Sequence, residues 1–227
     1  TAFKNTAHLT KFVRGATLPP ATSPTPTHRA AMGTLPKDDF TLDKENPISD
    51  SLWGYWPIVG RGHLKDYGPR GKQMSYVSTG YQMNQVSFAD GAWGARMYGN
   101  GHYYKADDGD IWPTGAITAS FWCYNDSTIT SSIIGNLSYV LAERFNCHCA
   151  WSDGKIYFDW GGFTDGTSRV IATIPANYLR SVWRHVLLYA KEGAGMGIWV
   201  DGKLINSHTS ASTPTRSTGS QGASTIG

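Results

Sequence analysis

Acidic residues are the first candidates for chemistry in this chain, because two carboxylates on one face of a strand can cleave a glycosidic bond. On a strand, that arrangement needs acidic residues two or four positions apart. The chain has three glutamates, Glu45, Glu143 and Glu192, which lie far apart in the sequence, and it has no E-x-D-x-x-E pattern. The sequence therefore gives no support to hydrolysis by a carboxylate pair.

Nucleophilic and phosphate-binding sites find no support either. Serine is abundant, but the chain contains no G-x-S-x-G motif, the turn that exposes a catalytic serine. His185 lies in the middle of a predicted strand, where we expect it to be packed and hydrogen-bonded rather than catalytic. The segment Gly99-Asn100-Gly101 lacks the following helix that a phosphate site uses. We therefore predict that the protein is not an enzyme.

Two segments contain residues that metals bind. Asp107, Asp108 and Asp110 form an acidic loop that is either a solvated turn or a calcium-binding loop with oxygen ligands. Partner carboxylates cannot be placed from the sequence, so the solvated turn is favoured and calcium is the alternative. The Cys147-His148-Cys149 segment lacks the second pair of ligands that structural zinc needs. We predict no cofactor, and we expect the cysteines to be buried thiols rather than a disulfide or metal site.

Aromatic residues near turns are the candidates for ligand binding. Sugar sites combine an aromatic platform with a few polar groups in a shallow cleft. Tyr104 and Trp112 flank the acidic loop, and Trp151 stands just before the Asp153-Gly154 turn. We predict that Tyr104, Trp112 and Trp151 contact a ligand. Exposed aromatic residues at the same places would equally mark a protein interface.

The elements that would position these residues are strands. Residues 183–189 alternate between two faces, and residues 197–203 run into Asp201-Gly202, the dipeptide that favours a tight hairpin turn. The 26 glycines and 13% aromatic residues suit many strands and tight turns. The one plausible helical stretch, residues 174–182, is short. A chain of 227 residues is long enough for one β-sandwich with a substantial core.

These strands resemble those of a known family. The W-x-H-V segment at 183–186 and the segment at 198–203, which ends in W-V-D-G-K, are similar to core motifs of the laminin-G-like, concanavalin A-like lectin/glucanase jelly-roll family. Further similar segments follow the family's order at 52–57, 66–68, 94–103, 117–124 and 224–227. The resemblance implies an all-β fold, a two-sheet antiparallel β-sandwich over residues 51–227. It also implies core positions for Trp56, Trp122, Trp183 and Trp199. Most members of that family bind ligands at surfaces, and only some are enzymes.

Residues 1–50 differ in composition from the rest of the chain. They hold six of the eleven prolines, and before Asp38 they contain five basic residues and no acidic one. Because proline fixes φ and removes a hydrogen-bond donor, we predict an extended, basic N-terminal arm that ends in a polar connector. The arm is either a disordered leader or a docking segment that orders on a partner.

The docking interpretation assigns a role to six residues of the arm. Phe3, Phe12 and Val13 are the apolar anchors, whereas Lys4, Lys11 and Arg14 face an acidic partner. The arm has a second possible role, because the family normally continues past the motif at 224–227 into a strand that this chain lacks. That strand comes either from further residues or from elsewhere in the chain, the arm included.

Charge and hydrophobicity argue against two classes of partner. The net charge is +3 without a Lys/Arg cluster, so we expect no nucleic-acid binding. No apolar run approaches membrane-spanning length, so we expect no membrane insertion.

The remaining observations favour a virion protein. The fold is typical of extracellular binding, yet the N-terminus is unlike a signal peptide and the cysteine count is odd. A bacteriophage protein that assembles in the host cytoplasm and is then exposed on the virion explains both the fold and the lack of secretion features. We predict a homo-oligomeric capsid decoration or head or tail appendage protein, docked through its arm to other virion proteins and displaying a lectin-like sandwich. The alternatives are a free extracellular module that binds cell-surface glycans and, third, a glycoside hydrolase of the same superfamily.

Overall fold

The computed structural model describes most of the chain from residue 66 onward and a few residues before it. The described residues are 52, 54–56, 66, 68–77, 84–87, 93–96, 101–106, 112–113, 115–125, 132–136, 140–175, 178–180, 182–215 and 224–226. The chain divides into two compact units. The first unit comprises residues 1–74 and 82–96, and the second comprises residues 75–81 and 97–227.

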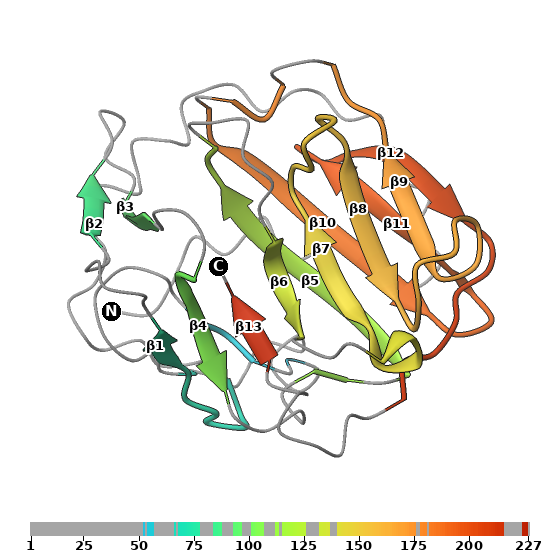
Figure 1. Ribbon diagram of the computed structural model, residues 1–227, viewed down its shortest axis with the longest axis horizontal. Helices are drawn as coiled ribbons and strands as arrows, with labels where there is room; N and C mark the ends of the chain where they lie inside the picture. Colours follow the sequence, from blue (N-terminus) through green and yellow to red (C-terminus); the bar gives the residue numbers. More distant parts are fainter. Residues whose placement is uncertain are drawn as a thin grey trace. The chain divides into compact units, whose positions relative to one another are not determined.

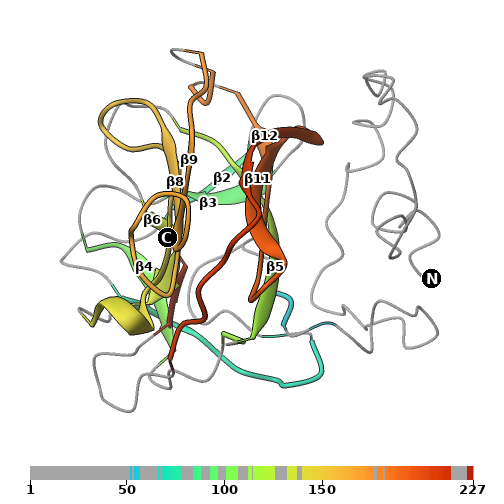
Figure 2. The same cartoon turned by 90° about the vertical axis from the view of Figure 1, so that its right-hand side faces the viewer.

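The second unit contains two antiparallel sheets that stack face to face (Figures 1 and 2). The seven-stranded sheet has the order β1 (Ser75–Val77), β4 (Tyr103–Ala106), β13 (Ser224–Ile226), β6 (Ser132–Asn136), β7 (Phe145–His148), β8 (Ile156–Trp160) and β9 (Arg169–Ala172). The four-stranded sheet has the order β12 (Lys203–His208), β11 (Gly195–Val200), β10 (Arg184–Lys191) and β5 (Ala116–Cys123). The predicted all-β, two-sheet antiparallel sandwich is therefore confirmed.

Helical structure in the described residues is limited to one turn of 3-10 helix, η4 (Leu141–Glu143). None of it is long and apolar enough to cross a membrane. The helix expected near residues 174–182 does not form in the described part of that stretch, where Arg180 instead makes an isolated bridge with Asn125.

The core of the second unit follows from the alternation of side chains along its strands. In β10, every second residue is buried: Val186, Leu188 and Ala190. The seven-stranded sheet contributes Phe145, Cys147, Ile156, Phe158, Trp160, Val170 and Ala172, none of which is more than 1% exposed. The side chains between these positions point to the outer face of each sheet.

The hairpin between β11 and β12 forms as the Asp-Gly dipeptide predicts. Asp201 has φ 51° and Gly202 has φ 78°, and these positive values are what a two-residue turn of this type requires. The Asp201 carboxylate also accepts a hydrogen bond from the His185 backbone N–H at 3.0 Å and pairs with Arg184 at 2.7 Å. The aspartate therefore fixes the turn against the neighbouring strand β10.

One expected core residue lies on the surface instead. Trp122 is 58% exposed, because it pairs across the sheet with His185 on the outer face of β5 and β10. The Trp122 and His185 rings lie 5.3 Å apart, and His185 is hydrogen-bonded to Ser120 at 2.8 Å. The expectation of a packed, hydrogen-bonded His185 is confirmed, whereas the core position of Trp122 is wrong. Trp56, Trp183 and Trp199, the other expected core tryptophans, are half-buried.

The first unit contains a hairpin of β2 (Asn84–Ser87) and β3 (Trp93–Arg96). Its described residues also include part of the segment at 66–68 that resembles a family loop. The Asp66 carboxylate is buried there and accepts three hydrogen bonds from backbone N–H groups at 2.7–3.1 Å. The donors are Tyr55, Gly68 and Lys72. The segment at 52–57 resembles a core strand of the family, but its described residues, 52 and 54–56, are not in a strand. The arm and the boundary near residue 50 lie outside the described residues and stay predictions.

The three cysteines are buried thiols, as expected. The sulfur atoms of Cys123 and Cys149 lie 3.8 Å apart, between the four-stranded sheet and the end of β7. Burial raises the pKa of Cys147 well above its ordinary value. These side chains therefore pack as small apolar groups.

Candidate functional site

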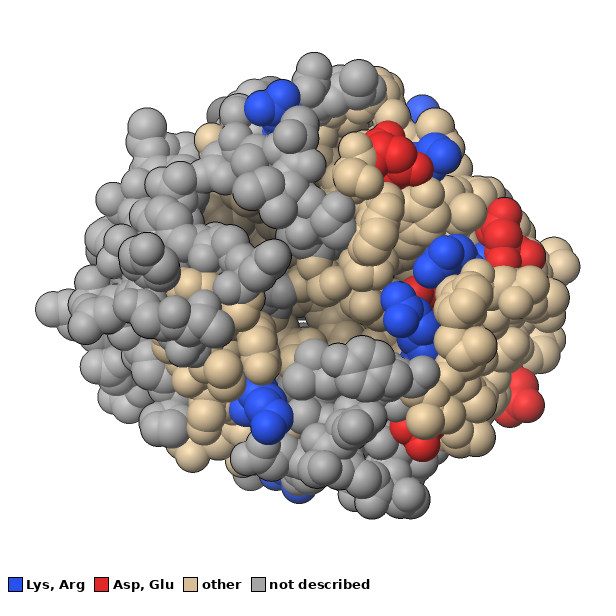
Figure 3. Space-filling model, in the orientation of Figure 1, with Lys and Arg blue, Asp and Glu red and all other residues tan. Residues whose placement is uncertain are grey.

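The outward-facing side chains at the β9 end of the seven-stranded sheet form a group that is polar and aromatic. The β7–β9 face, as we call it, comprises Arg144, Asn146, His148, Trp151, Tyr157, Asp159 and Arg169. Cross-strand register brings the group together: Asn146 pairs with Asp159, which pairs in turn with Arg169, and His148 pairs with Tyr157. Figure 3 shows basic side chains gathered on this side of the molecule with acidic atoms between them.

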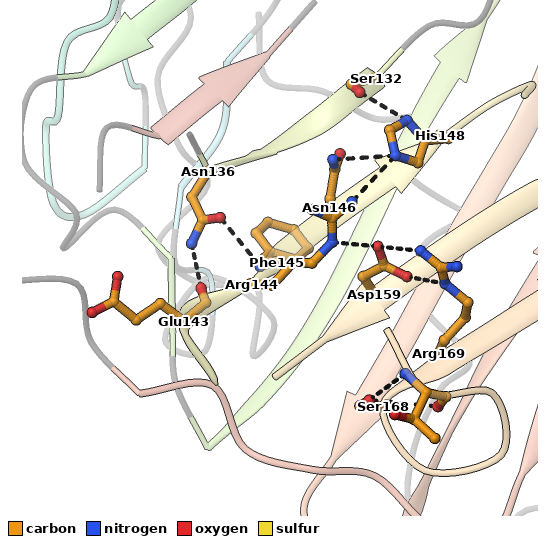
Figure 4. Close-up of polar contacts among 11 residues, drawn as sticks. Ser132, Asn136, Glu143, Arg144, Phe145, Asn146, His148, Asp159, Ser168 and Arg169 are labelled. Carbon is orange, nitrogen blue, oxygen red and sulfur yellow. Dashed lines mark hydrogen bonds and ion pairs between the residues drawn. The ribbon is translucent and has the colours of Figure 1, made fainter. Parts of the chain in front are cut away.

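Asp159 is the centre of the β7–β9 face. Its carboxylate is fully buried and contacts two guanidinium groups (Figure 4). Arg144 donates from Nε at 2.5 Å, and Arg169 donates from Nε at 2.5 Å and from Nη2 at 2.9 Å. A buried charge is tolerated only when it is paired and hydrogen-bonded in this way. Asp159 therefore holds both arginines in fixed positions.

His148 lies beside this ion-pair group and is 7% exposed. Its Nε2 faces two donors, Arg144 Nη2 and Asn146 Nδ2, each at 3.4 Å. Because Nε2 must accept there, the ring proton lies on Nδ1, which donates to Ser132 Oγ at 2.8 Å. Burial lowers the pKa of His148 to about 4, against an opposing effect of Asp159, and the neighbouring arginines lower it further. The ring is neutral at pH 7.

The lowered pKa makes stability depend on pH. The unfolded chain takes up a proton on His148 near pH 6.5, whereas the folded chain does so near pH 4. The unfolded state therefore binds more protons between these values, and we expect stability to fall by up to about 3 kcal/mol as the pH drops through that window. Urea melts at pH 7.5 and 4.5 should show this loss, and His148→Gln should reduce it. An NMR titration that placed the His148 midpoint near its ordinary value would contradict the prediction.

Aromatic rings form the exposed part of the β7–β9 face. Trp151 is 40% exposed and packs edge-on against His148 with ring centroids 4.3 Å apart. Its ring lies 6.1 Å from that of Tyr157, over which the Arg169 guanidinium stands at 5.0 Å. The ring of Phe163, which is 48% exposed, also lies near this guanidinium, at 5.5 Å. Sugar-binding surfaces combine an exposed aromatic ring with polar groups in fixed positions, and the β7–β9 face has both.

The structure places the three predicted ligand contacts differently. Trp151 lies on the β7–β9 face, but Tyr104 in β4 is fully buried and Trp112 is 8% exposed. The Trp112 ring N–H donates to the Gly135 carbonyl at 3.0 Å. Neither Tyr104 nor Trp112 presents its ring to solvent, so we correct the prediction for both and keep Trp151.

The other predicted site residues are outside the described residues. These are the arm residues Phe3, Lys4, Lys11, Phe12, Val13 and Arg14 and the acidic loop with Asp107, Asp108 and Asp110. Within the part of the chain that is described, no three His, Cys, Asp or Glu side chains are grouped to hold a metal ion.

Sequence reasoning missed Arg144, Asp159 and Arg169. A signal was present, since polar residues at 146, 148, 157, 159 and 169 alternate with the apolar residues of three strands. That alternation marks an outward polar stripe on each strand. It does not show which stripes become neighbours.

The chain is similar to a solved structure and matches a family model. No curated protein matches the chain. Among solved structures, the binding domain of Paraclostridial Mosquitocidal Protein 1 is similar, with a TM-score of 0.40 and 11% identity over 72% of this chain. The match spans 44% of that protein's chain, which is less than half of its length.

The family model described as the concanavalin A-like lectin/glucanases superfamily matches residues 98–227. That range is more than half of the chain and contains all strands of both sheets except β1. The sequence resemblance, the two-sheet sandwich and this match agree. The chain belongs to the concanavalin A-like lectin/glucanase superfamily.

Proposed function

We propose that this protein is a non-enzymatic carbohydrate-binding protein and that the β7–β9 face binds the sugar. The observation that carries the proposal is the exposed Trp151 ring, held edge-on against His148 beside the fixed Arg144–Asp159–Arg169 group. A pyranose ring would pack its apolar face on Trp151, and its hydroxyl groups would find polar partners on the adjacent side chains.

The superfamily also contains glucanases, so hydrolysis of a glycan is the alternative to binding alone. Retaining and inverting glycosidases both need two carboxyl groups free to act on the bond, one as acid and one as nucleophile or base. The buried carboxyl of the β7–β9 face is not free in this sense, because both oxygens of Asp159 are bound by guanidinium groups. This arrangement supports binding over hydrolysis.

The binding proposal is tested with two tryptophan variants and an immobilised panel of glycans. We expect the purified protein to bind glycans in the panel, and Trp151→Ala to weaken that binding by at least about tenfold, as loss of a central aromatic contact does. Trp122→Ala is the matched control, because Trp122 is exposed on the outer face of the other sheet. Its binding should equal that of the wild type. Equal binding by Trp151→Ala and the wild type would overturn this assignment.

We further propose that the sandwich is displayed on a bacteriophage virion, as a capsid decoration or head or tail appendage. The support comes from the sequence: a basic, proline-rich segment with the anchors Phe3, Phe12 and Val13 precedes the sandwich. In this proposal the protein assembles in the host cytoplasm, and a free extracellular lectin is the alternative. Peptides of the chain should be found in gradient-purified particles of the phage that encodes it. Particles that incorporate a chain without residues 1–50 equally well would refute docking through the arm.

A further inference from the structure

The charges on the β7–β9 face do not cancel. Arg144 and Arg169 contribute two positive charges, and Asp159 contributes one negative charge. His148 is neutral at pH 7, since its pKa is about 4. Nearby Lys155 and Asp153 form their own ion pair at 3.2 Å and add no net charge. One positive charge therefore remains among the residues of the β7–β9 face. Asp165, which is 57% exposed and lies 3.1 Å from His208, adds a negative charge near Arg169, but solvent screens a charge that is so exposed.

Both arginines have donors left over for a ligand. Asp159 and His148 engage Nε and Nη2 of Arg144, and Asp159 engages the same two nitrogens of Arg169. Among the described residues, neither Nη1 atom has a hydrogen-bond partner, and the two side chains are 25% and 21% exposed. A guanidinium has five N–H groups, so each arginine can hold Asp159 and still donate outward.

The two guanidinium groups are also held rigidly. The fully buried Asp159 fixes their inner edges, and the Tyr157 and Phe163 rings lie 5.0 and 5.5 Å from the Arg169 guanidinium. A planar cation fixed in advance loses little entropy when it binds an anion. Carboxylate and sulfate oxygens match the geometry of such donors.

The position of the aromatic platform decides what kind of anion fits. The Tyr157 ring lies near both the Arg169 guanidinium, at 5.0 Å, and the Trp151 ring, at 6.1 Å, so it connects the aromatic platform with the cation. A ligand that covers both must combine a flat apolar ring with a negatively charged group. An acidic saccharide has both features.

We infer that the sugar bound on the β7–β9 face is acidic, carrying a carboxylate or sulfate group that binds the outer nitrogens of Arg144 and Arg169. This inference rests on the proposed function, which it makes more specific. Arg144 and Arg169 then select for the acidic substituent, and Trp151 binds the ring.

The test compares three sets of oligosaccharides of matched length: oligogalacturonates, sulfated galacto-oligosaccharides and neutral galacto-oligosaccharides. They are presented together with a broad panel of neutral and acidic glycans. We expect an acidic member to bind at least about tenfold more tightly than its neutral counterpart. We also expect this ratio to shrink between 50 mM and 300 mM NaCl, because salt screens the charge. The two acidic sets distinguish a carboxylate from a sulfate ligand.

Variants assign the effect to the arginines. Arg144→Gln and Arg169→Gln should each reduce the acidic-to-neutral ratio by at least about fivefold. Arg169→Lys keeps a cation beside Asp159 and should retain part of the ratio, which guards against misfolding of the glutamine variants. Lys203→Gln removes an exposed basic side chain on β12 of the four-stranded sheet and should leave the ratio unchanged.

The outcomes separate this inference from the proposed function. Tighter binding of acidic glycans that depends on both arginines supports the inference. The inference is overturned if the protein binds neutral glycans alone, or if both glutamine variants keep the preference for acidic glycans. Either result leaves the proposal of carbohydrate binding intact. Absence of binding to every glycan overturns both, as does binding to an acidic peptide alone.

Discussion

Phe145→Ala is expected to lower the free energy of unfolding by about 4 kcal/mol, the cost of removing a large aromatic side chain from a close-packed core. Phe145 is 1% exposed and stands at the centre of an aromatic cluster. Its ring centroid lies 5.1 Å from that of Trp112, 5.6 Å from Trp160 and 6.3 Å from Phe158, all edge-on. The substitution would leave a cavity among these buried rings, where solvent does not enter. The lost contacts are therefore not replaced.

Chemical denaturation of the purified variant measures this effect, and Phe163→Ala is the matched control. Phe163 is 48% exposed, so its removal should cost less than about 1 kcal/mol. If the two variants lost similar amounts of stability, Phe145 would not be the centre of the core, and the packing of the seven-stranded sheet would have to be revised.

Asp159→Asn is expected to cost about 3 kcal/mol, because it leaves two guanidinium groups against a neutral amide. The carboxylate is fully buried, whereas the arginines are 25% and 21% exposed. The arginines can therefore recover some hydration when the anion is lost. That recovery places the cost at the low end of the range for breaking a buried ion pair.

Asp153→Asn is the control for this variant, since Asp153 pairs with Lys155 and is 38% exposed. Exposed ion pairs contribute little, and the substitution should cost less than about 1 kcal/mol. Urea melts at pH 7 compare the two. An Asp159→Asn variant as stable as Asp153→Asn would show that the arginines do not depend on the buried carboxylate.

The fold could be predicted from local patterns, but the inner face of every strand could not. Alternation along residues 183–189 and the Asp201-Gly202 turn define two strands and their hairpin. Alternation shows which face is inside only where one face is apolar and the other is polar. Trp122 illustrates this limit, because cross-strand pairing with His185 places it on the outer face although it lies in a strand typical of the family.

The site was less predictable than the fold, because cross-strand register creates it. Asp159 meets Arg144 and Arg169, which lie 15 and 10 positions away in the sequence, on neighbouring segments of the sheet. No local spacing identifies such a group. Trp151 was found because it precedes a tight turn, where side chains tend to reach solvent. Tyr104 and Trp112 flank a loop as well, but their side chains point into the core.

The central claim, that the β7–β9 face binds the sugar, is tested most directly by the tryptophan indole N–H signals in NMR. The nine tryptophans give a small set of signals, and Trp151→Phe and Trp122→Phe assign the two that matter. We expect titration with a glycan that binds the protein to shift the Trp151 signal and to leave Trp122, on the outer face of the other sheet, unchanged. A shift of Trp122 with an unmoved Trp151 would contradict the claim and place the sugar on the four-stranded sheet.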